Sequence, residues 1–387
     1  MTVDDAGTIT AVGTRASLRA QASGLPETRA EGVLLPGLVN AHTHLELAHL
    51  AGGVPGGQGV IAWTRALAAR LQDAPAPPTT REAAARDAAA QARARGAAAL
   101  GDVGNGTSGW RALAHAGLGG VFFHELVGSR EARTGDALAD AAAEREGVPP
   151  SERPPGVAAV PAPHAPYSLG PDLMRRIFAA AAAMDLPTSI HLAEDPDEVS
   201  LLRDGSGGWP PVLRALGVPP EDRIPRLEPC AYLDALGAFA TLRPPLLVHM
   251  VHASADDRRR AREAAATVVL CPRSNLHIGH RLPDAPALLD EGVRIALGTD
   301  SLASAPDSSL WPELATLAEA FPDVPARAWL HAATAGGARA LDLARLGTLA
   351  PGRRPGLLDV APAQRSADPE RDLVRDPNPS VRWLANP

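Results

Sequence analysis

Eight short apolar segments recur between residues 37 and 297, and each has the length of a buried β-strand. We expect these strands at Gly37–Ala41, Ala97–Val103, Gly120–Leu126, Val157–Pro161, Pro187–His191, Pro245–His249, Thr267–Cys271 and Val293–Leu297. Stretches rich in alanine, arginine and leucine lie between them and predict helices, most clearly at Arg81–Arg95, Pro171–Met184, Ala255–Ala265 and Asp284–Glu291. Eight repeats of strand then helix predict an α/β fold of the (β/α)8 TIM-barrel type, for which 387 residues are enough.

The two ends of the chain do not fit this repeat. Residues 7–13 read as a small strand and turn, and residues 347–352 followed by 357–360 read as another. We therefore predict a small β-subdomain made from residues 1–35 and 345–387, beside a barrel of residues 36–344. The proline-rich stretches at 75–80, 148–155 and 362–379 are expected to be connectors or a loose tail.

Composition limits the partners and the location. The formal net charge of -7 and the pI near 6.0 argue against nucleic acid or an acidic membrane as a partner. No apolar run reaches the ~18 residues of a membrane span, and the polar, acidic first ten residues do not read as a signal peptide. The two cysteines, Cys230 and Cys271, give no disulfide framework, which predicts a reducing, cytoplasmic environment.

The sequence contains no lysine, so all 37 basic residues are arginine. This absence excludes every mechanism that needs a lysine side chain, including a Schiff base. It also excludes a metal bridge made from a carbamylated lysine.

Polar residues follow the expected strands, and a barrel places its active site at these carboxyl ends. His42 and His44 come at the end of the first strand, where an i, i+2 spacing puts both imidazoles on one face. His191 ends the fifth strand and Asp300 follows the eighth. Three imidazoles and one carboxylate form a nitrogen-rich site for one divalent transition metal. Zinc, iron and manganese all suit these ligands, with zinc preferred.

These residues carry a family resemblance. The segment from Leu35 to His44, His191 with Glu194, His249, and the run Gly298-Thr299-Asp300-Ser301 resemble the amidohydrolase superfamily in its cytosine-deaminase-like, ATZ/TRZ-type branch. The resemblance extends over nearly the whole chain. It implies a distorted barrel with a composite β-sandwich built from both chain ends, for which the N-terminal flank is short by a strand or two. Together with the missing lysine, it implies a site for one metal.

The resemblance also implies catalytic roles. Asp300 would both bind the metal and accept a proton from water, and His249 would orient that water. Glu194 would protonate a ring nitrogen and then the departing ammonia. His252 competes with His249 for its role, while His124 and Glu125 are better explained as supporting residues.

The loops around this motif set resemble those of aminofutalosine deaminases and of S-adenosylhomocysteine and methylthioadenosine deaminases. This implies hydrolytic removal of the amino group from an adenosine-like nucleoside, a small-molecule substrate. Trp63, His164 and Arg273 are candidate substrate contacts, although a position in the core or in a lid explains Trp63 equally well. Ser274 and Asn275, in the same loop as Arg273, are explained equally well as residues that only brace that loop. Two alternatives stay open: hydrolysis of another C–N or C–Cl bond, and a metal-binding scaffold without catalysis. The oligomeric state is not fixed by the sequence, and a homodimer is compatible with it.

Overall fold

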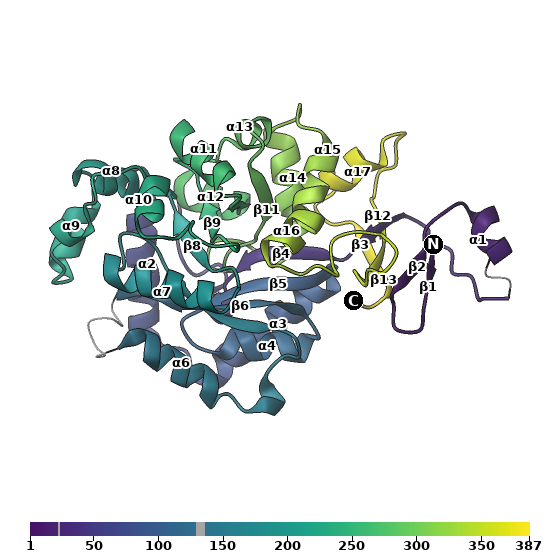
Figure 1. The fold of residues 1–387 in the computed structure, drawn as a ribbon, viewed down its shortest axis with the longest axis horizontal. Helices are drawn as coiled ribbons and strands as arrows, with labels where there is room; N and C mark the ends of the chain where they lie inside the picture. Colours follow the sequence, from purple (N-terminus) through teal and green to yellow (C-terminus); the bar gives the residue numbers. More distant parts are fainter. Residues whose placement is uncertain (22–23, 129–135) are drawn as a thin grey trace.

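Parallel strands form the centre of the molecule in the computed structural model, which describes residues 1–21, 24–128 and 136–387 (Figure 1). Within those residues eight such strands form two sheets of four. One sheet has the order β4 (Leu38–Thr43), β5 (Ala97–Gly104), β6 (Gly119–Leu126), β7 (Ala158–Pro163), and the other β8 (Ser189–Leu192), β9 (Leu246–His249), β10 (Thr267–Leu270), β11 (Arg294–Leu297). Each strand expected from the sequence overlaps one of these, so the predicted α/β barrel strands are confirmed.

Helices follow the strands as expected. Their bounds are α2 (Val60–Asp73), α3 (Pro78–Ala94), α4 (Ser108–Ala116), α6 (Ala137–Gly147), α7 (Pro171–Ala183), α8 (Pro196–Asp204), α9 (Trp209–Ala215), α10 (Pro229–Ala235), α11 (Ala255–Glu263), α12 (Pro272–Gly279), α13 (Ala285–Asp290), α14 (Leu310–Ala320), α15 (Ala326–His331) and α16 (Gly337–Ala340). Shorter turns are η1 (Leu45–Leu50), η2 (Pro150–Glu152), η3 (Pro220–Arg223) and η4 (Ala332–Gly336). Within the described residues, no helix is both long and apolar enough to span a membrane.

The two sheets meet at two seams. Between β4 and β11, the amides of Thr299 and Asp300 donate to the carbonyl of His42 at 3.0 and 3.1 Å. Between β7 and β8, the amide of His191 donates to the carbonyl of His164 at 2.9 Å. Among the described residues these are local contacts rather than continuous ladders. The barrel is therefore distorted, with two halves joined near the carboxyl ends of the strands.

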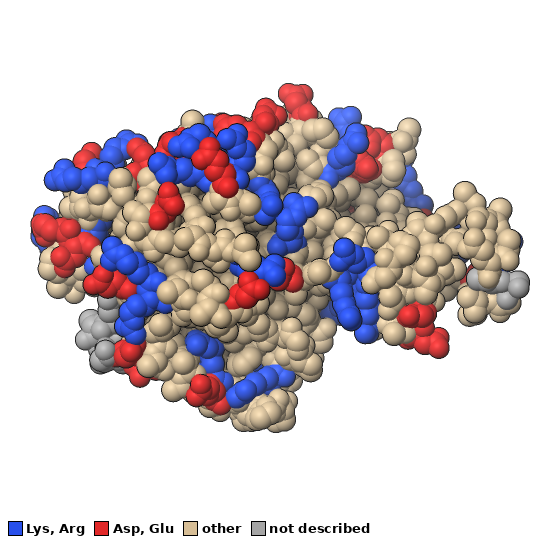
Figure 2. All heavy atoms as spheres, viewed as in Figure 1, with Lys and Arg blue, Asp and Glu red and all other residues tan. Residues whose placement is uncertain are grey.

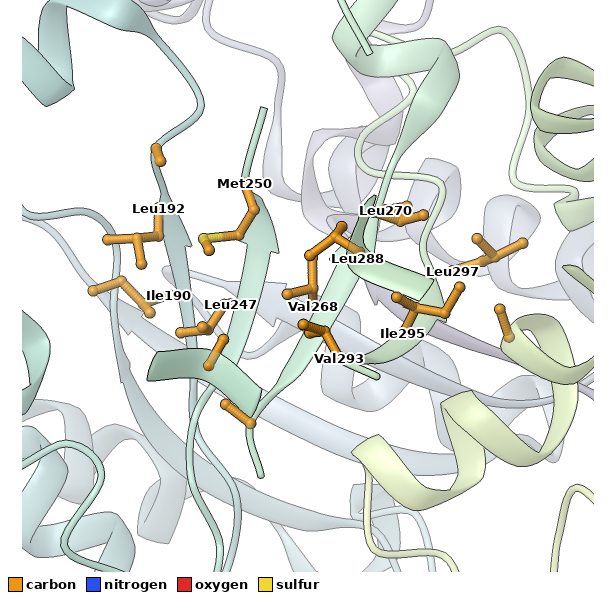
Figure 3. Close-up of a cluster of buried hydrophobic side chains, with 14 of the residues drawn as sticks. Ile190, Leu192, Leu247, Met250, Val268, Leu270, Leu288, Val293, Ile295 and Leu297 are labelled. Atoms are coloured by element: carbon orange, nitrogen blue, oxygen red, sulfur yellow. The ribbon is translucent and has the colours of Figure 1, made fainter. Parts of the chain in front are cut away.

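Side chains on the strands alternate between one interior cluster and outer clusters that pack against helices, as a barrel requires. Val248 and Ala296 of one sheet share an interior cluster with Val39 and Phe123 of the other. The alternate residues face outward and pack against helices. Figure 3 shows part of one outer cluster, in which the labelled strand residues are Ile190, Leu192, Leu247, Val268, Leu270, Ile295 and Leu297. Both faces of the strands are buried, which explains their continuous apolar sequences.

The chain ends add two small antiparallel sheets. The elements are β1 (Thr2–Val3), β2 (Ile9–Ala11), α1 (Arg15–Gln21), β3 (Val33–Pro36), β12 (Leu357–Ala361), α17 (Pro369–Arg375) and β13 (Ser380–Ala385). Strand β1 pairs with β2, and β12 lies between β3 and β13, so residues from both termini share a sheet as the sequence predicts. The division into residues 1–35 with 345–387 and residues 36–344 stays a prediction.

The expectation of a loose tail at residues 362–379 is wrong. Helix α17 lies inside that stretch, and its Leu373 and Val374 are buried in the same cluster as the outward-facing strand residues. The helix begins after Asp368, whose side chain accepts a hydrogen bond from the amide of Arg371. A capped helix with an apolar face is stable despite the prolines around it.

Acidic and basic side chains are interspersed over the face shown in Figure 2. In that view neither sign gathers into the single-sign surface that a nucleic-acid footprint requires. The exclusion of nucleic acid as a partner stays a prediction.

Two adjacent glycines at the start of β6 provide a test of the barrel packing. A Cβ at Gly120 would lie 1.9 Å from the carbonyl oxygen of Leu100, and its φ of +140° is unfavourable for any other residue. We expect Gly120→Ala to destabilise the fold by about 3 kcal/mol. A Cβ at Gly119 would meet its nearest atom at an ordinary 3.6 Å, so Gly119→Ala is the matched control. Urea unfolding of both variants checks this, and equal midpoints would contradict the packing described.

Candidate metal centre and active site

Three imidazoles and one carboxylate converge at the carboxyl ends of the barrel strands. The Nε2 atoms of His42 and His44 lie 3.6 and 3.5 Å from Oδ1 of Asp300. The Nε2 atoms of His44 and His191 are 3.4 Å apart. All four side chains are buried, so the structure brings together the four residues that the sequence nominated as ligands.

The spacing of these atoms fits one metal ion. Ligands about 2.1 Å from a tetrahedral ion are separated from one another by roughly 3.4 Å. The observed separations of 3.4 to 3.6 Å are close to that value. Both ring nitrogens of His42 are buried and have no hydrogen-bond partner among the described residues, a costly arrangement without a ligand. We take the four residues as a candidate centre for one divalent metal.

Burial sets the protonation states needed for metal binding. It lowers the pKa of His44 to about 3, with a further contribution from His42, and lowers the pKa of His191 well below its usual value. Burial acts to raise the pKa of the Asp300 carboxyl, yet the contacts with His42 and His44 hold that pKa well below its usual range. Neutral imidazoles and an ionised carboxylate are the forms that coordinate metals.

Hydrogen bonds hold the candidate ligands in place. The hydroxyls of Ser274 and Ser304 both donate to Oδ2 of Asp300, which leaves Oδ1 facing the histidines. Nδ1 of His191 lies 2.9 Å from the carbonyl of His164, so a proton on Nδ1 leaves Nε2 free to bind a metal. Bracing of its loop was one explanation that the sequence left open for Ser274, and the sequence assigned no role to Ser304. Its one signal was its position four residues after Asp300.

Glu194 and His249 lie beside this centre. Oε1 of Glu194 is 3.5 Å from Nε2 of His249, and both side chains are buried. The amide of Asn275 lies 2.9 Å from Nδ1 of His249 and donates to it, so Nε2 carries the proton of the neutral ring. Burial lowers the pKa of His249 to about 4. It also raises the pKa of Glu194 well above its usual range, and the charge of Asp300 adds to this rise.

The backbone near Glu194 and at His249 is strained. Ala193 and His249 have φ angles of +50° and +75°, in the left-handed region that non-glycine residues rarely adopt. The carboxylate of Glu198 accepts the amides of Ala193 and Glu194 at 2.9 and 3.2 Å and so holds the turn. Sequence reasoning missed Glu198, because a glutamate on an expected helix reads as a surface residue. Its side chain is fully buried, and burial raises its pKa to about 8.

The three candidate substrate contacts have different environments. Ser168 donates its hydroxyl proton to Ala165, so Nδ1 of His164 donates to Ser168 and Nε2 of His164 is left as an acceptor. Trp63 packs between two apolar clusters, and its buried Nε1 has no partner among the described residues. Both assignments stay predictions.

Arg273 is held by other protein groups. Its guanidinium donates to the carboxylates of Glu313 and Asp307, from 2.6 to 3.2 Å, and to the carbonyls of Asp307 and Ser309. Glu313 is fully buried, so separating the pair would leave an unpaired charge in the core. This geometry favours a structural role for Arg273 over a contact with the substrate.

Glu125 and His124 lie next to the metal centre. Oε1 of Glu125 is 3.6 Å from Nδ1 of His191, on the side of the ring away from the other ligands. His124 contacts the carbonyl of Asn105 and the carboxylate of Glu144 instead. These positions favour the supporting roles expected for both. His252 lies farther out, lining a cavity with Glu194.

The serine contacts with Asp300 predict a test of metal affinity. Removing a hydrogen bond that orients a metal ligand weakens binding by about 10-fold to 100-fold, so we expect a loss of that size for Ser274→Ala. Ser301 is equally buried, but its hydroxyl contacts Ser304 and not Asp300, so Ser301→Ala is the control. Competition with a chromophoric chelator measures both affinities. Unchanged zinc affinity in Ser274→Ala would argue against this arrangement.

Comparisons of the sequence with known proteins identify a family and named relatives for this chain. The amidohydrolase family model matches residues 33–378. An aminodeoxyfutalosine deaminase of Deinococcus radiodurans is 34% identical over 342 residues, 86% of this chain and 79% of that protein. A 5-methylthioadenosine/S-adenosylhomocysteine deaminase of Pelotomaculum thermopropionicum is 30% identical over 219 residues, 55% of this chain and 46% of that protein.

Two solved structures share the fold. Helicobacter pylori aminofutalosine deaminase, crystallised with methylthio-coformycin, has a TM-score of 0.84 at 22% identity and covers 99% of this chain and 93% of its own. A zinc-bound adenosine deaminase of Xanthomonas campestris has a TM-score of 0.71 at 25% identity and covers 91% and 78%. With a family match over most of its length, this chain belongs to the amidohydrolase family.

Proposed function

We propose that this protein is a metal-dependent hydrolase that removes the amino group from an adenosine-like nucleoside and releases ammonia. The observation that carries the proposal is the placement of Glu194, 3.5 Å from His249 and beside the cluster of three histidines and Asp300. The relatives named as aminodeoxyfutalosine and methylthioadenosine/S-adenosylhomocysteine deaminases support this substrate class.

Three side chains have different roles in the addition of water to the ring carbon. Glu194, with its raised pKa, would hold a proton near neutral pH and give it to the ring nitrogen next to the attacked carbon. His249 would orient the attacking water through the Nε2–H that faces Glu194. Asp300 would accept one proton of the water. The ionised Glu194 would take the other proton from the added hydroxyl and pass it to the departing ammonia, and the proton on Asp300 would then return Glu194 to its acid form.

The cluster of His42, His44, His191 and Asp300 would hold the metal. A divalent ion bound there lowers the pKa of water and so supplies a nucleophile near neutral pH. We propose zinc, because three imidazoles and a carboxylate suit it and the Xanthomonas campestris structure holds zinc. Iron and manganese are compatible with the same ligands. We also propose a small-molecule substrate and a cytoplasmic location, and a homodimer as an assembly to test.

The activity is tested by measuring ammonia release from four substrates. The zinc-loaded protein is incubated with aminodeoxyfutalosine, S-adenosylhomocysteine, methylthioadenosine and adenosine. We expect turnover of at least one, with a kcat/KM above about 10⁴ M⁻¹ s⁻¹ for the preferred substrate. Metal-loaded protein that turns over none of the four would contradict the proposed function.

Two variants separate proton transfer from metal binding. We expect Glu194→Gln to lower kcat by at least about 10²-fold while metal content is unchanged, because glutamine cannot transfer the proton. His191→Ala is expected to lose both metal and turnover. Metal content by mass spectrometry and initial rates check the pair. Loss of metal from Glu194→Gln would count against the role given to Glu194.

A further inference from the structure

A cavity of about 270 Å³ opens next to Glu194, away from the candidate metal ligands. The beginnings of α2 and α8 and the end of α12 supply residues of its lining. Asn275, which hydrogen-bonds His249, lines the same cavity as Glu194. A ligand that reaches the reacting atoms at one end therefore has room for a substituent at the other.

The outer part of this cavity carries positive charge. Arg281 lines it and is exposed, and its guanidinium has no ion pair or hydrogen bond among the described residues. His252 also lines the cavity, and its amide donates to the carbonyl of Ala193 at 2.8 Å, which ties it to the turn before Glu194. Burial lowers the pKa of His252, and the positive charge of Arg281 lowers it further.

Besides Glu194, two acidic residues line the cavity, and both have other partners. Asp195 accepts the amides of Val60 and Asp197 at 3.0 and 2.7 Å, and so caps the starts of α2 and α8. The carboxylate of Asp197 lies against Gly207 and Gly208. A Cβ built on either glycine would be 2.8 Å from one of its oxygens. Among the described residues neither aspartate forms an ion pair with Arg281, so its guanidinium is available to an anionic ligand.

We propose that this cavity is the subsite for the substituent beyond the ribose, and that Arg281 binds a carboxylate on it. The inference rests on the proposed deaminase function and narrows its substrate class. Nucleosides with a carboxylate-bearing 5′ substituent are preferred over those with a neutral thioether. Arg281 takes the part that the sequence suggested for Arg273, whose guanidinium is already held by Glu313 and Asp307.

The test compares two substrates in one variant. Aminodeoxyfutalosine carries a benzoate, whereas methylthioadenosine ends in an uncharged methylthio group. In Arg281→Gln we expect kcat/KM for aminodeoxyfutalosine to fall about 10-fold to 100-fold, mainly through KM, because a charge-assisted hydrogen bond is lost. For methylthioadenosine we expect a change below about twofold. Arg281→Lys, which keeps the charge, is expected to recover part of the loss.

The control is Arg262→Gln, an exposed arginine on α11 that does not line the cavity, which is expected to change neither substrate. An equal loss for both substrates in Arg281→Gln, or no loss for either, would overturn the subsite. Turnover of neither substrate by the parent enzyme would count against the proposed function instead.

Measurements of substrate binding test the subsite independently of catalysis. Zinc-loaded Glu194→Gln protein, with and without Arg281→Gln, is titrated with aminodeoxyfutalosine and methylthioadenosine by calorimetry. A Kd that rises about 10-fold or more for aminodeoxyfutalosine alone supports the subsite whether or not turnover occurs. Equal Kd values in the two proteins would refute it.

Discussion

The contact on which the site depends is a pair of backbone hydrogen bonds. The amides of Thr299 and Asp300 donate to the carbonyl of His42, and this contact closes the barrel between β4 and β11. At this contact Asp300 adopts a left-handed backbone conformation, with a φ of +57°. Its carboxylate lies opposite His42 and His44. The contact that joins β4 to β11 thus also places three of the four candidate metal ligands opposite one another.

Burial then gives each group near that contact its chemical form. The same loss of water lowers the pKa of His44 and raises the pKa of Glu194, because it disfavours the charged form of both. Neutral imidazoles are suited to a cation, and a protonated carboxyl is suited to an acid catalyst. Asp300 stays ionised because the imidazoles around it and the hydroxyls of Ser274 and Ser304 stabilise its charge.

The sequence could predict the features that repeat or that sit at strand ends. The eight strands are visible as apolar runs, and His42, His44, His191 and Asp300 follow from their positions after such runs. It could not predict contacts that depend on how distant segments pack. The pair between Arg273 and Glu313 joins residues forty positions apart on two helices, so an arginine near the motif read equally well as a substrate contact.

The residues proposed to carry out the reaction and the residue proposed to select the substrate come from different parts of the barrel. The candidate metal ligands and His249 lie on strands or directly after them, where backbone bonds and buried neighbours fix their positions. Arg281 lies beyond the end of α12, is exposed, and contributes to no buried cluster. A substitution there changes the charge at the mouth of the cavity without disturbing the packing that holds Glu194. A fold built this way can vary its substrate while it keeps one hydrolytic centre.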